Sequence, residues 1–302
     1  MMLITVKDAI HKRRMKINMF EKICKMSQKN LKKYIANQLQ ATHNKVINSD
    51  GYVYAQGTFP VLLVAHLDTV HKELPKAILY DEDQDAMYSP QGIGGDDRCG
   101  VYMILQVIQK YNCSVLFCED EEIGCVGAEK FIKTKLAKDL SFNYIIEFDR
   151  KGNNDAVFYD CDNADFEKFI TKDFYKSSWG SFSDISVIAP ALKCAAVNLS
   201  CGYYNAHTTG EYVVMSDMKR SIIEACKILE RTTEDDKFEY IEYKNHWDYI
   251  GNESLSKMYF IEYLDDDGRP QYDEIYAISE EEAVGIFCMD HPTIPYGSIA
   301  VW

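Results

Sequence analysis

Five short islands of the sequence carry acidic and histidine side chains of the kinds that bind metal ions. The first is VLLVAHLDTV, which begins at Val61, and the others are GGDDRCG, EDEEIGC, IIEFDRKG and YNAHTTGEY, in that order along the chain. Each island lies at the edge of an apolar segment, and open α/β sheets bind ligands at such strand ends. The side chains in them that could do chemistry are His66, Asp68, Asp96, Glu121, Glu122, Asp149 and His207.

This set has the composition of a site for two zinc ions. Zinc takes imidazole nitrogen and carboxylate oxygen in a roughly tetrahedral shell, and a catalytic zinc site keeps one position for water. A pair of ions needs one bridging carboxylate, and we expect Asp96 to supply it. The remaining ligands would be His66 and Asp149 for one ion, and Glu122 and His207 for the other. Mixed nitrogen and oxygen ligands favour zinc, although cobalt or manganese could also bind.

Two further acidic residues beside these ligands indicate hydrolysis of an amide bond. Paired metal ions polarise a carbonyl group and lower the pKa of bound water, and a general base must then move a proton from that water to the leaving amine. Glu121 adjoins the expected ligand Glu122, so it could take this proton without binding metal. Asp68 lies two residues after His66, on the same side of an extended strand end, where it would accept the second imidazole N–H.

Other polar residues near the islands have weaker cases as ligands. The alternatives to Asp149 are Glu147, Asp160 and Asp162, and strand phase and motif order favour Asp149. We expect Asp97 to support the site without binding metal, and Arg98 to pair locally. The histidines without partners in the pattern, expected at the surface, are His43, His71, His246 and His291.

Together the five islands resemble the co-catalytic zinc exopeptidases and deacylases, a group that includes peptidase T, carboxypeptidase G, aminoacylase and bacterial leucyl aminopeptidases. HLDTV is similar to the first metal motif of the peptidase T branch, GDDRCG to its bridging-aspartate motif, and DEEIG to its pair of base and ligand. The resemblance covers roughly residues 55 to 230. It implies a two-zinc hydrolase in which Asp96 bridges the ions, Glu121 is the base, and Asp149 and His207 are the last two ligands in order.

The sequence departs from the peptidase T branch in one respect. That branch inserts a lid and dimerisation domain between its fourth and fifth ligand motifs, but Asp149 and His207 are too close in this sequence to hold one. The stretch from Asp68 to Asp96 is likewise too short for a substrate-binding insertion. We therefore expect an open cleft, a layout similar to that of the lid-free aminopeptidases, and no lid-mediated dimer.

The composition limits the partners of the chain. Its 302 residues are 47% hydrophobic and 26% charged, and the net charge of −14 argues against binding nucleic acid through a basic surface. Ten cysteines occur without a CxxC pair, which favours reduced, buried thiols in a cytoplasmic protein. The first residues contain no continuous apolar stretch, so neither a signal peptide nor a membrane segment is expected there.

Apolar runs and helical periodicities alternate along the chain and predict an α/β fold. Strands are expected over 60–65, 114–118, 143–148 and 195–199, with a hairpin turn at Asp50 and Gly51. Helices are expected over 18–39, 101–110, 126–136, 164–175, 183–189 and 215–231. With the resemblance, this pattern gives a three-layer α/β/α sandwich with a mixed central sheet.

We divide the chain into a catalytic domain, residues 1–249, whose first 45 residues include the N-terminal helices, and a small α+β appendix, residues 250–302. The appendix is β-rich: MYFIEYL and YDEIYAI flank the turn DDDGRP and predict a hairpin, SEEEAVGIF a short helix, and SIAVW a last strand. It contains no ligand-like cluster, so we expect it to be non-catalytic.

The leading hypothesis is an aminopeptidase that acts on short peptides with a free amino end. A carboxypeptidase or an N-acyl-amino-acid deacylase is the alternative, and it would need a cation such as Arg150 to hold the substrate carboxylate. A third hypothesis is a catalytically silent binding protein, which the complete set of metal and base residues disfavours. Tyr203, Tyr204 and the SSWGSFSD loop could line a substrate pocket or form an ordinary loop.

Overall fold

The five islands lie within the first of two structural units, which are Met1–Tyr243 and Lys244–Trp302. The computed structural model describes residues 18–180 and 182–243 of the first unit. Of the second it describes residues 257–264, 270–277, 283–284, 287, 291, 294 and 299–301. Within these ranges, no helix combines the length and the apolar character needed to cross a membrane.

Apolar runs of the first unit form a mixed sheet of eight strands in the order β1-β2-β6-β3-β7-β10-β8-β9. They are β1 (Lys45–Ser49), β2 (Tyr52–Gln56), β3 (Phe59–His66), β6 (Cys113–Cys118), β7 (Tyr144–Arg150), β8 (Asp155–Val157), β9 (Lys176–Ser178) and β10 (Ala196–Ser200). The central strands β6, β3, β7 and β10 run parallel, and β2 and β8 pair antiparallel with this group. These four central strands and the β1–β2 hairpin confirm the sequence prediction.

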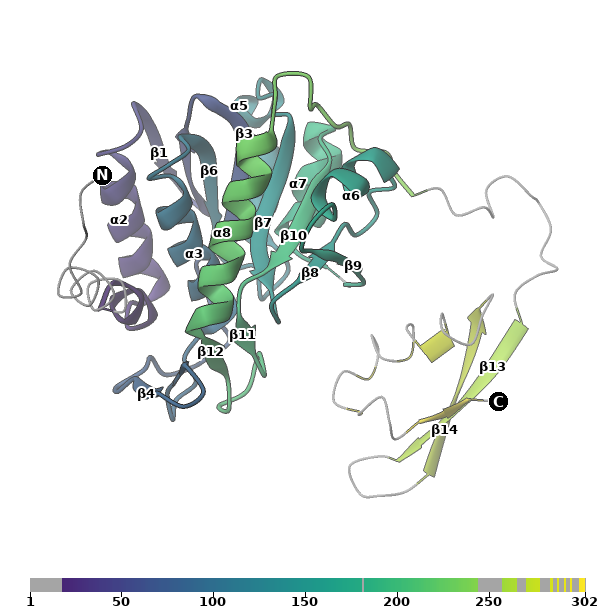
Figure 1. Cartoon of the computed structure of the whole chain (residues 1–302). Coiled ribbons are helices and arrows are strands. Elements are labelled where there is room, and N and C mark those ends of the chain that lie inside the picture. The colour runs from purple at the N-terminus through teal and green to yellow at the C-terminus, as the bar shows by residue number, and fades with distance from the viewer. Residues whose placement is uncertain are drawn as a thin grey trace. The chain divides into compact units, whose positions relative to one another are not determined.

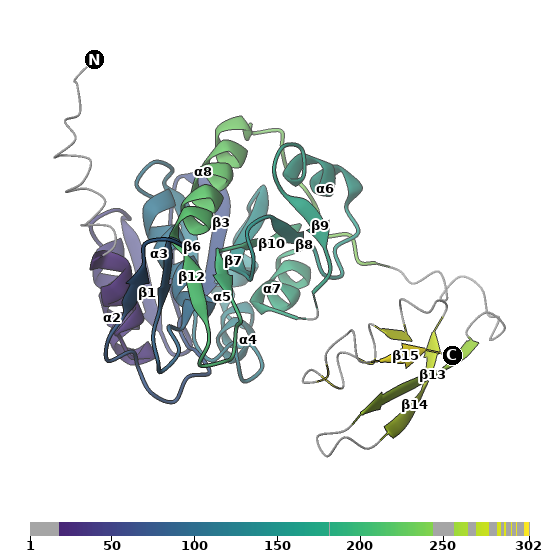
Figure 2. The ribbon, with the colours of Figure 1, turned by 60° about the horizontal axis from the view of Figure 1, so that its bottom comes forward.

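Helices cover both faces of this sheet, which confirms the predicted α/β/α sandwich (Figures 1 and 2). After the helical residues 18–24 they are α2 (Gln28–Leu39), α3 (Gly95–Val107), α4 (Val126–Ile132), α5 (Lys135–Lys138), α6 (Ala164–Ile170), α7 (Asp184–Leu192) and α8 (Met215–Arg231). Neighbouring side chains of a strand point to opposite faces. Leu63 therefore packs with α2, α3 and α8, whereas Leu62 and Val64 pack with α4, α5 and α7.

Two predicted helices differ from the prediction: one is divided in two and the other ends early. The helix over 126–136 is divided into α4 and α5, because the Thr134 side chain accepts a hydrogen bond from Ala137 N and begins a new helix. The helix over 164–175 ends at Ile170, and Tyr175 is instead buried where its hydroxyl donates to the Ser221 carbonyl of α8. Tertiary contacts thus set helix ends that periodicity alone does not define.

A second, four-stranded sheet in the first unit was not predicted. Its order is β11-β12-β5-β4, and its strands are β4 (Leu79–Asp81), β5 (Ala86–Tyr88), β11 (Tyr203–Tyr204) and β12 (Tyr212–Val214). The stretch from Asp68 to Asp96 thus holds the small β4–β5 hairpin. Between Asp149 and His207 the described residues form β8, α6, β9, α7, β10 and β11, which leaves no place for a lid domain among them.

The second unit contains a three-stranded antiparallel sheet in the order β14-β13-β15. The predicted hairpin is formed by β13 (Lys257–Leu264) and β14 (Pro270–Ala277), and the predicted last strand by β15 (Ala300–Val301). Residues 283, 284 and 287 are helical, within the predicted helix, and residues 265–269 of the predicted turn lie outside the described residues. A small apolar cluster is built from Ile261, Ile275, Ala283, Val284 and Phe287.

Candidate metal centre and catalytic base

The parallel strands bring the islands together at one edge of the large sheet. His66 is the last residue of β3, and it pairs with Cys118 at the end of β6, directly before the EDEEIGC island. Val64 pairs with Glu147 in the neighbouring strand β7, so His66 and Asp149, each two residues further on, lie level with each other. Parallel pairing thus places three of the five islands side by side.

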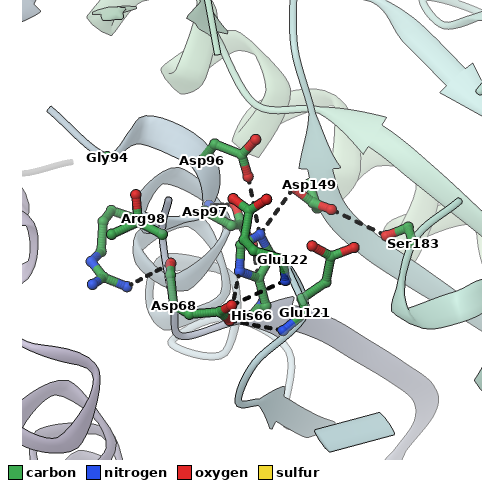
Figure 3. Close-up of polar contacts among 12 residues, drawn as sticks. His66, Asp68, Gly94, Asp96, Asp97, Arg98, Glu121, Glu122, Asp149 and Ser183 are labelled. Carbon is green, nitrogen blue, oxygen red and sulfur yellow. Dashed lines mark hydrogen bonds and ion pairs between the residues drawn. The ribbon is translucent and has the colours of Figure 1, made fainter. Parts of the chain in front are cut away.

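Asp96 reaches the same edge from the start of α3. Gly94 before it has left-handed backbone angles (φ 68°, ψ 40°), and Asp96 and Asp97 depart from helical geometry. The regular helix therefore begins after them, and the Asp96 carboxylate is directed toward the strand ends (Figure 3). Its Oδ1 lies 3.0 Å from His66 Nε2 and its Oδ2 lies 3.1 Å from His207 Nε2. One carboxylate thus faces two imidazoles through different oxygens, which is the arrangement expected of a bridging ligand.

Each imidazole has a second carboxylate of its own. His66 Nε2 lies 3.5 Å from Asp149 Oδ1, and His207 Nε2 lies 3.2 Å from Glu122 Oε2. Ligand atoms of His66, Asp96 and Glu122 all lie within 4.8 Å of one another. The five residues expected as ligands therefore form two adjoining groups that share Asp96.

The electrostatics of this cluster favour a cation. Contacts with Asp96 and Glu122 raise the pKa of His207 to about 10. Burial raises the pKa of Asp149 to about 7, and the nearby Asp96 carboxylate adds to this effect. Burial would also raise the pKa of Asp96, but contacts with His207 and His66 outweigh it and hold the pKa below the ordinary value. The carboxylates thus stabilise positive charge at the position of the imidazoles.

Two observations test whether metal ions fit this site. Glu122 Oε1 is buried and has no hydrogen-bond partner among the described residues, although buried polar atoms almost always have one. The donor set, two imidazoles and three carboxylates, is also the set that zinc accepts. The residues present therefore fit zinc, which could be held by His66, Asp96 and Asp149 on one side and by Asp96, Glu122 and His207 on the other.

Asp68 supports this cluster from the loop after β3. Its Oδ1 lies 3.1 Å from His66 Nδ1, the ring nitrogen that faces away from Asp96. The same carboxylate accepts the backbone N–H groups of Glu121 at 3.1 Å and Glu122 at 3.0 Å (Figure 3). Asp68 therefore lies where it can orient the imidazole, and it also holds the loop that carries the candidate base.

Glu121 lies in a half-buried position beside the candidate ligands. Burial raises the pKa of Glu121 to about 8, and nearby Asp149 and Asp184 carboxylates add to the shift while His66 opposes it. A carboxyl group with a pKa near neutrality can both accept and return a proton at physiological pH. Glu121 therefore remains the candidate for the general base, next to the candidate ligand Glu122.

Asp149 is fixed by residues that the sequence did not identify. The Asn198 side chain accepts from Asp149 N at 2.9 Å and donates to Asp149 O at 3.0 Å. The Ser183 hydroxyl contacts Asp149 Oδ2 at 3.1 Å and Glu147 Oε2 at 2.5 Å. Glu147, an alternative ligand by sequence, is thus directed to Ser183. Asn198 comes from β10 and Ser183 from the N-cap of α7, so strand pairing and helix packing bring both to the site.

Other sequence expectations near the site have mixed outcomes. Asp97 is fully buried and accepts hydrogen bonds from His66 N at 3.3 Å and Gly100 N at 2.8 Å, which is a supporting position. Its carboxylate also lies close to the Asp149 carboxylate and to the His66 ring. Arg98 is buried and donates to the backbone carbonyls of Leu67, Asp68 and Met26, all of which are far from it in the sequence, so the expected local pairing is wrong.

The expectation of surface histidines is wrong at two positions. His43 is 5% exposed, and the His71 side chain is 8% exposed with its Nε2 2.8 Å from Glu211 Oε2. His291 is half-buried and stacks on Phe287, and His246 lies outside the described residues. Both buried histidines have partners more than sixty positions away in the chain, which no local pattern could indicate.

Aromatic residues expected to line a pocket divide into two groups. Tyr203 is buried with its hydroxyl 3.4 Å from Asp149 Oδ1, and the Tyr204 hydroxyl donates to Asp217 at 2.6 Å. On the loop before Ser183, Trp179 is 58% exposed and Phe182 is 53% exposed. The tyrosines therefore support the fold around the site, while the loop presents apolar surface next to it.

Comparisons with known proteins identify the fold. No protein-family model matches the chain, and no curated protein matches it by sequence. Among solved structures it is similar to the aminopeptidase PepT from Bacillus cereus, with a TM-score of 0.59 and 13% identity over 71% of this chain and 97% of that one. A tripeptidase from Staphylococcus aureus gives 0.57 and 12% over 71% and 97%. An aminopeptidase from the archaeon Desulfurococcus kamchatkensis gives 0.55 and 16% over 74% and 97%.

The chain therefore has the fold of these aminopeptidases, as the resemblance of its motifs implied. At such identities the similarity establishes the fold, and the activity has to be argued from the site.

Proposed function

We propose that the protein is a two-zinc aminopeptidase that removes residues from the amino end of short peptides. The observation that carries the proposal is the position of Asp96, whose two oxygens each face one imidazole at 3.0 and 3.1 Å. Each imidazole also has its own second carboxylate, and Glu121, a half-buried glutamate that is not needed as a ligand, lies beside them. Metal-assisted hydrolysis requires these groups, namely metal ligands, a bridging carboxylate and a general base.

In the proposed mechanism the side chains have separate roles. When bound, zinc ions polarise the scissile carbonyl group and make water a better nucleophile. Glu121 accepts a proton from the attacking water and returns it to the leaving nitrogen. Asp68 keeps the proton of His66 on Nδ1, so that Nε2 presents its lone pair to the site. Ser183 and Asn198 hold Asp149 in place from two neighbouring elements.

The charges around the site favour a substrate with a free ammonium group. Asp96, Glu121, Glu122 and Asp149 all lie at the same sheet edge and attract positive charge. Arg150, the cation that a carboxypeptidase would need, already pairs with Asp155 at 3.2 Å through two of its nitrogens. Its commitment to Asp155 disfavours recognition of a substrate carboxylate.

Metal analysis of the purified full-length chain, with a substrate panel, tests the proposal. We expect two zinc ions per chain, loss of both in Asp96→Ala, and cleavage of short peptides that N-terminal acetylation abolishes. Glu121→Gln should retain metal and lose about a hundredfold or more in turnover. Glu129→Gln, on α4 and paired with Lys133, is the matched control and should behave as the wild type.

Other outcomes would move the protein to a different class. Equal cleavage of acetylated and free peptides, or a requirement for a free carboxyl end, would indicate a deacylase or carboxypeptidase. Two bound ions without turnover of any amide substrate would indicate a binding protein on the same fold. Retention of two ions by Asp96→Ala would refute the assignment of the bridge.

A further inference from the structure

The candidate mechanism does not use Glu211, a buried carboxyl group beside the candidate metal site. Glu211 has no exposed surface. Its Oε2 accepts from Gly94 N at 2.7 Å and lies 2.8 Å from His71 Nε2, and its Oε1 accepts from Asp96 N at 2.9 Å. A carboxylate oxygen only accepts, so His71 carries the proton in this contact. Burying such a group is costly unless it is fully hydrogen-bonded, and here both oxygens are.

The three donors lie on two segments of the chain and Glu211 lies on a third, and each of these segments carries a candidate ligand. His71 lies five residues after His66, and Asp96 is itself the proposed bridge. Glu211 lies four residues after His207, in the loop between β11 and β12. A single carboxyl group therefore joins the His66 loop, the Asp96 turn and the His207 loop.

The backbone at Asp96 is shaped to receive this carboxyl group. Gly94 has left-handed angles, and the N–H groups on either side of Gly95 converge on Glu211, a concave arrangement that suits an anion. A Cβ atom at Gly95 would lie 2.8 Å from Tyr203 Cβ and 3.3 Å from Glu211 Oε1. Glycine at position 95 therefore lets the turn lie close to Tyr203 and Glu211.

We propose that Glu211, together with His71, is a positioning residue that sets the backbone of Asp96 so that one carboxylate serves two metal ions. Sharing a carboxylate requires that its plane and reach be fixed, because its oxygens must face His66 and His207 at the same time. Holding Asp96 through its backbone N–H leaves both side-chain oxygens for the site. The proposal rests on the proposed function in its reference to metal, but the joining of the loops can be measured without any ion.

Glu211→Gln is the most direct variant. The side chain keeps its size but has one oxygen, so its NH2 group must face a backbone N–H that needs an acceptor. We expect the zinc affinity to fall about tenfold to a hundredfold, the range for residues that orient metal ligands, measured by competition with a chelator. The control is Glu224→Gln, another buried glutamate, which accepts from Arg220 and Lys227 on α8 and should leave zinc affinity unchanged.

Hydrogen exchange of the full chain after chelator treatment separates the two proposals. We expect the amides of Gly94 and Asp96 to exchange faster in Glu211→Gln than in the wild type, and circular dichroism to show an unchanged fold. If Glu211→Gln does not fold, His71→Asn removes one donor and should speed exchange in the same segment. Unchanged exchange at Gly94 and Asp96 in the folded variant would overturn the positioning role, whether or not zinc binds. Faster exchange in a protein that binds no zinc would uphold it and reject the metal centre.

Discussion

Asp184 offers a test of how burial controls charge next to the site. It is the first residue of α7, directly after Ser183, and its side chain is fully buried. Neither of its carboxyl oxygens has a hydrogen-bond partner among the described residues. A charge in such a place is unfavourable, so the group should prefer its protonated form. Asp184→Asn replaces it with a side chain of the same shape that does not titrate.

The size of the effect follows from the pKa. Burial raises the pKa of Asp184 from the ordinary 3.8 to about 6, against the opposing influence of His66 and of the Cys118 and Cys125 thiols. The folded state thus holds this proton more tightly than the unfolded chain, so the stability it gives is complete below pH 3.8 and is lost as the pH rises through about 6. One pKa unit corresponds to about 1.4 kcal/mol, so the whole loss is about 3 kcal/mol, and roughly half of it falls between about pH 5 and about pH 8.

We therefore expect the free energy of unfolding of Asp184→Asn, relative to the wild type, to rise by roughly 1 kcal/mol between about pH 5 and about pH 8. Urea unfolding of chelator-treated protein, followed by circular dichroism at several pH values, measures this difference. Asp165→Asn is the matched control, since Asp165 is in the first turn of α6 but exposed, and its difference should stay constant. Parallel pH curves for Asp184→Asn and the wild type would refute the reasoning.

Three further predictions follow from other parts of the structure. Ile123, 75% exposed directly after Glu122, and Phe182, 53% exposed directly before Ser183, should contact an apolar first residue of the substrate. Replacing either by serine should raise KM for such peptides about tenfold, or ~1.4 kcal/mol, and leave KM for peptides that begin with glycine unchanged. Gly100→Ala would place a Cβ atom against the Phe148 carbonyl oxygen, and we expect the free energy of unfolding, measured by thermal unfolding, to fall by roughly 3 kcal/mol or more. A chain that ends after Tyr243 should keep its metal and its activity on short peptides, because the second unit has its own apolar cluster. A truncated protein that binds metal but is inactive would show that the second unit shapes the substrate site.

The central part of the fold could be predicted because each buried strand is a continuous apolar run. β3, β6, β7 and β10 are buried on both faces, so their sequences are apolar without alternation and stand out from the flanking residues. The second sheet could not be predicted in this way. Its strands have only two or three residues each, which is too short for any periodicity, and the β5–β12 pairing that joins its two halves is between segments far apart in the chain.

The sequence indicated the candidate ligands better than it indicated the residues that hold them in place. Several expected ligands occur next to a residue expected to assist them, such as His66 with Asp68 or Glu122 with Glu121, and local spacing indicates both. Glu211 occurs in the same island as His207, yet its partner His71 is 140 positions away. Only the folded chain brings these two together, and a lone acidic residue in a loop gives no sign that it will be fully buried.

The supporting carboxylates have a property in common that the ligands lack. Asp68, Asp97 and Glu211 each accept backbone N–H groups from a segment that carries a candidate ligand or the base. Their hydrogen bonds are made by the peptide backbone, so these bonds do not depend on whether an ion is bound. The segments that carry His66 and Asp96 are therefore held by hydrogen bonds that do not involve an ion. In a site organised in this way, little of the free energy of ion binding is needed to order the loops, so the affinity is higher.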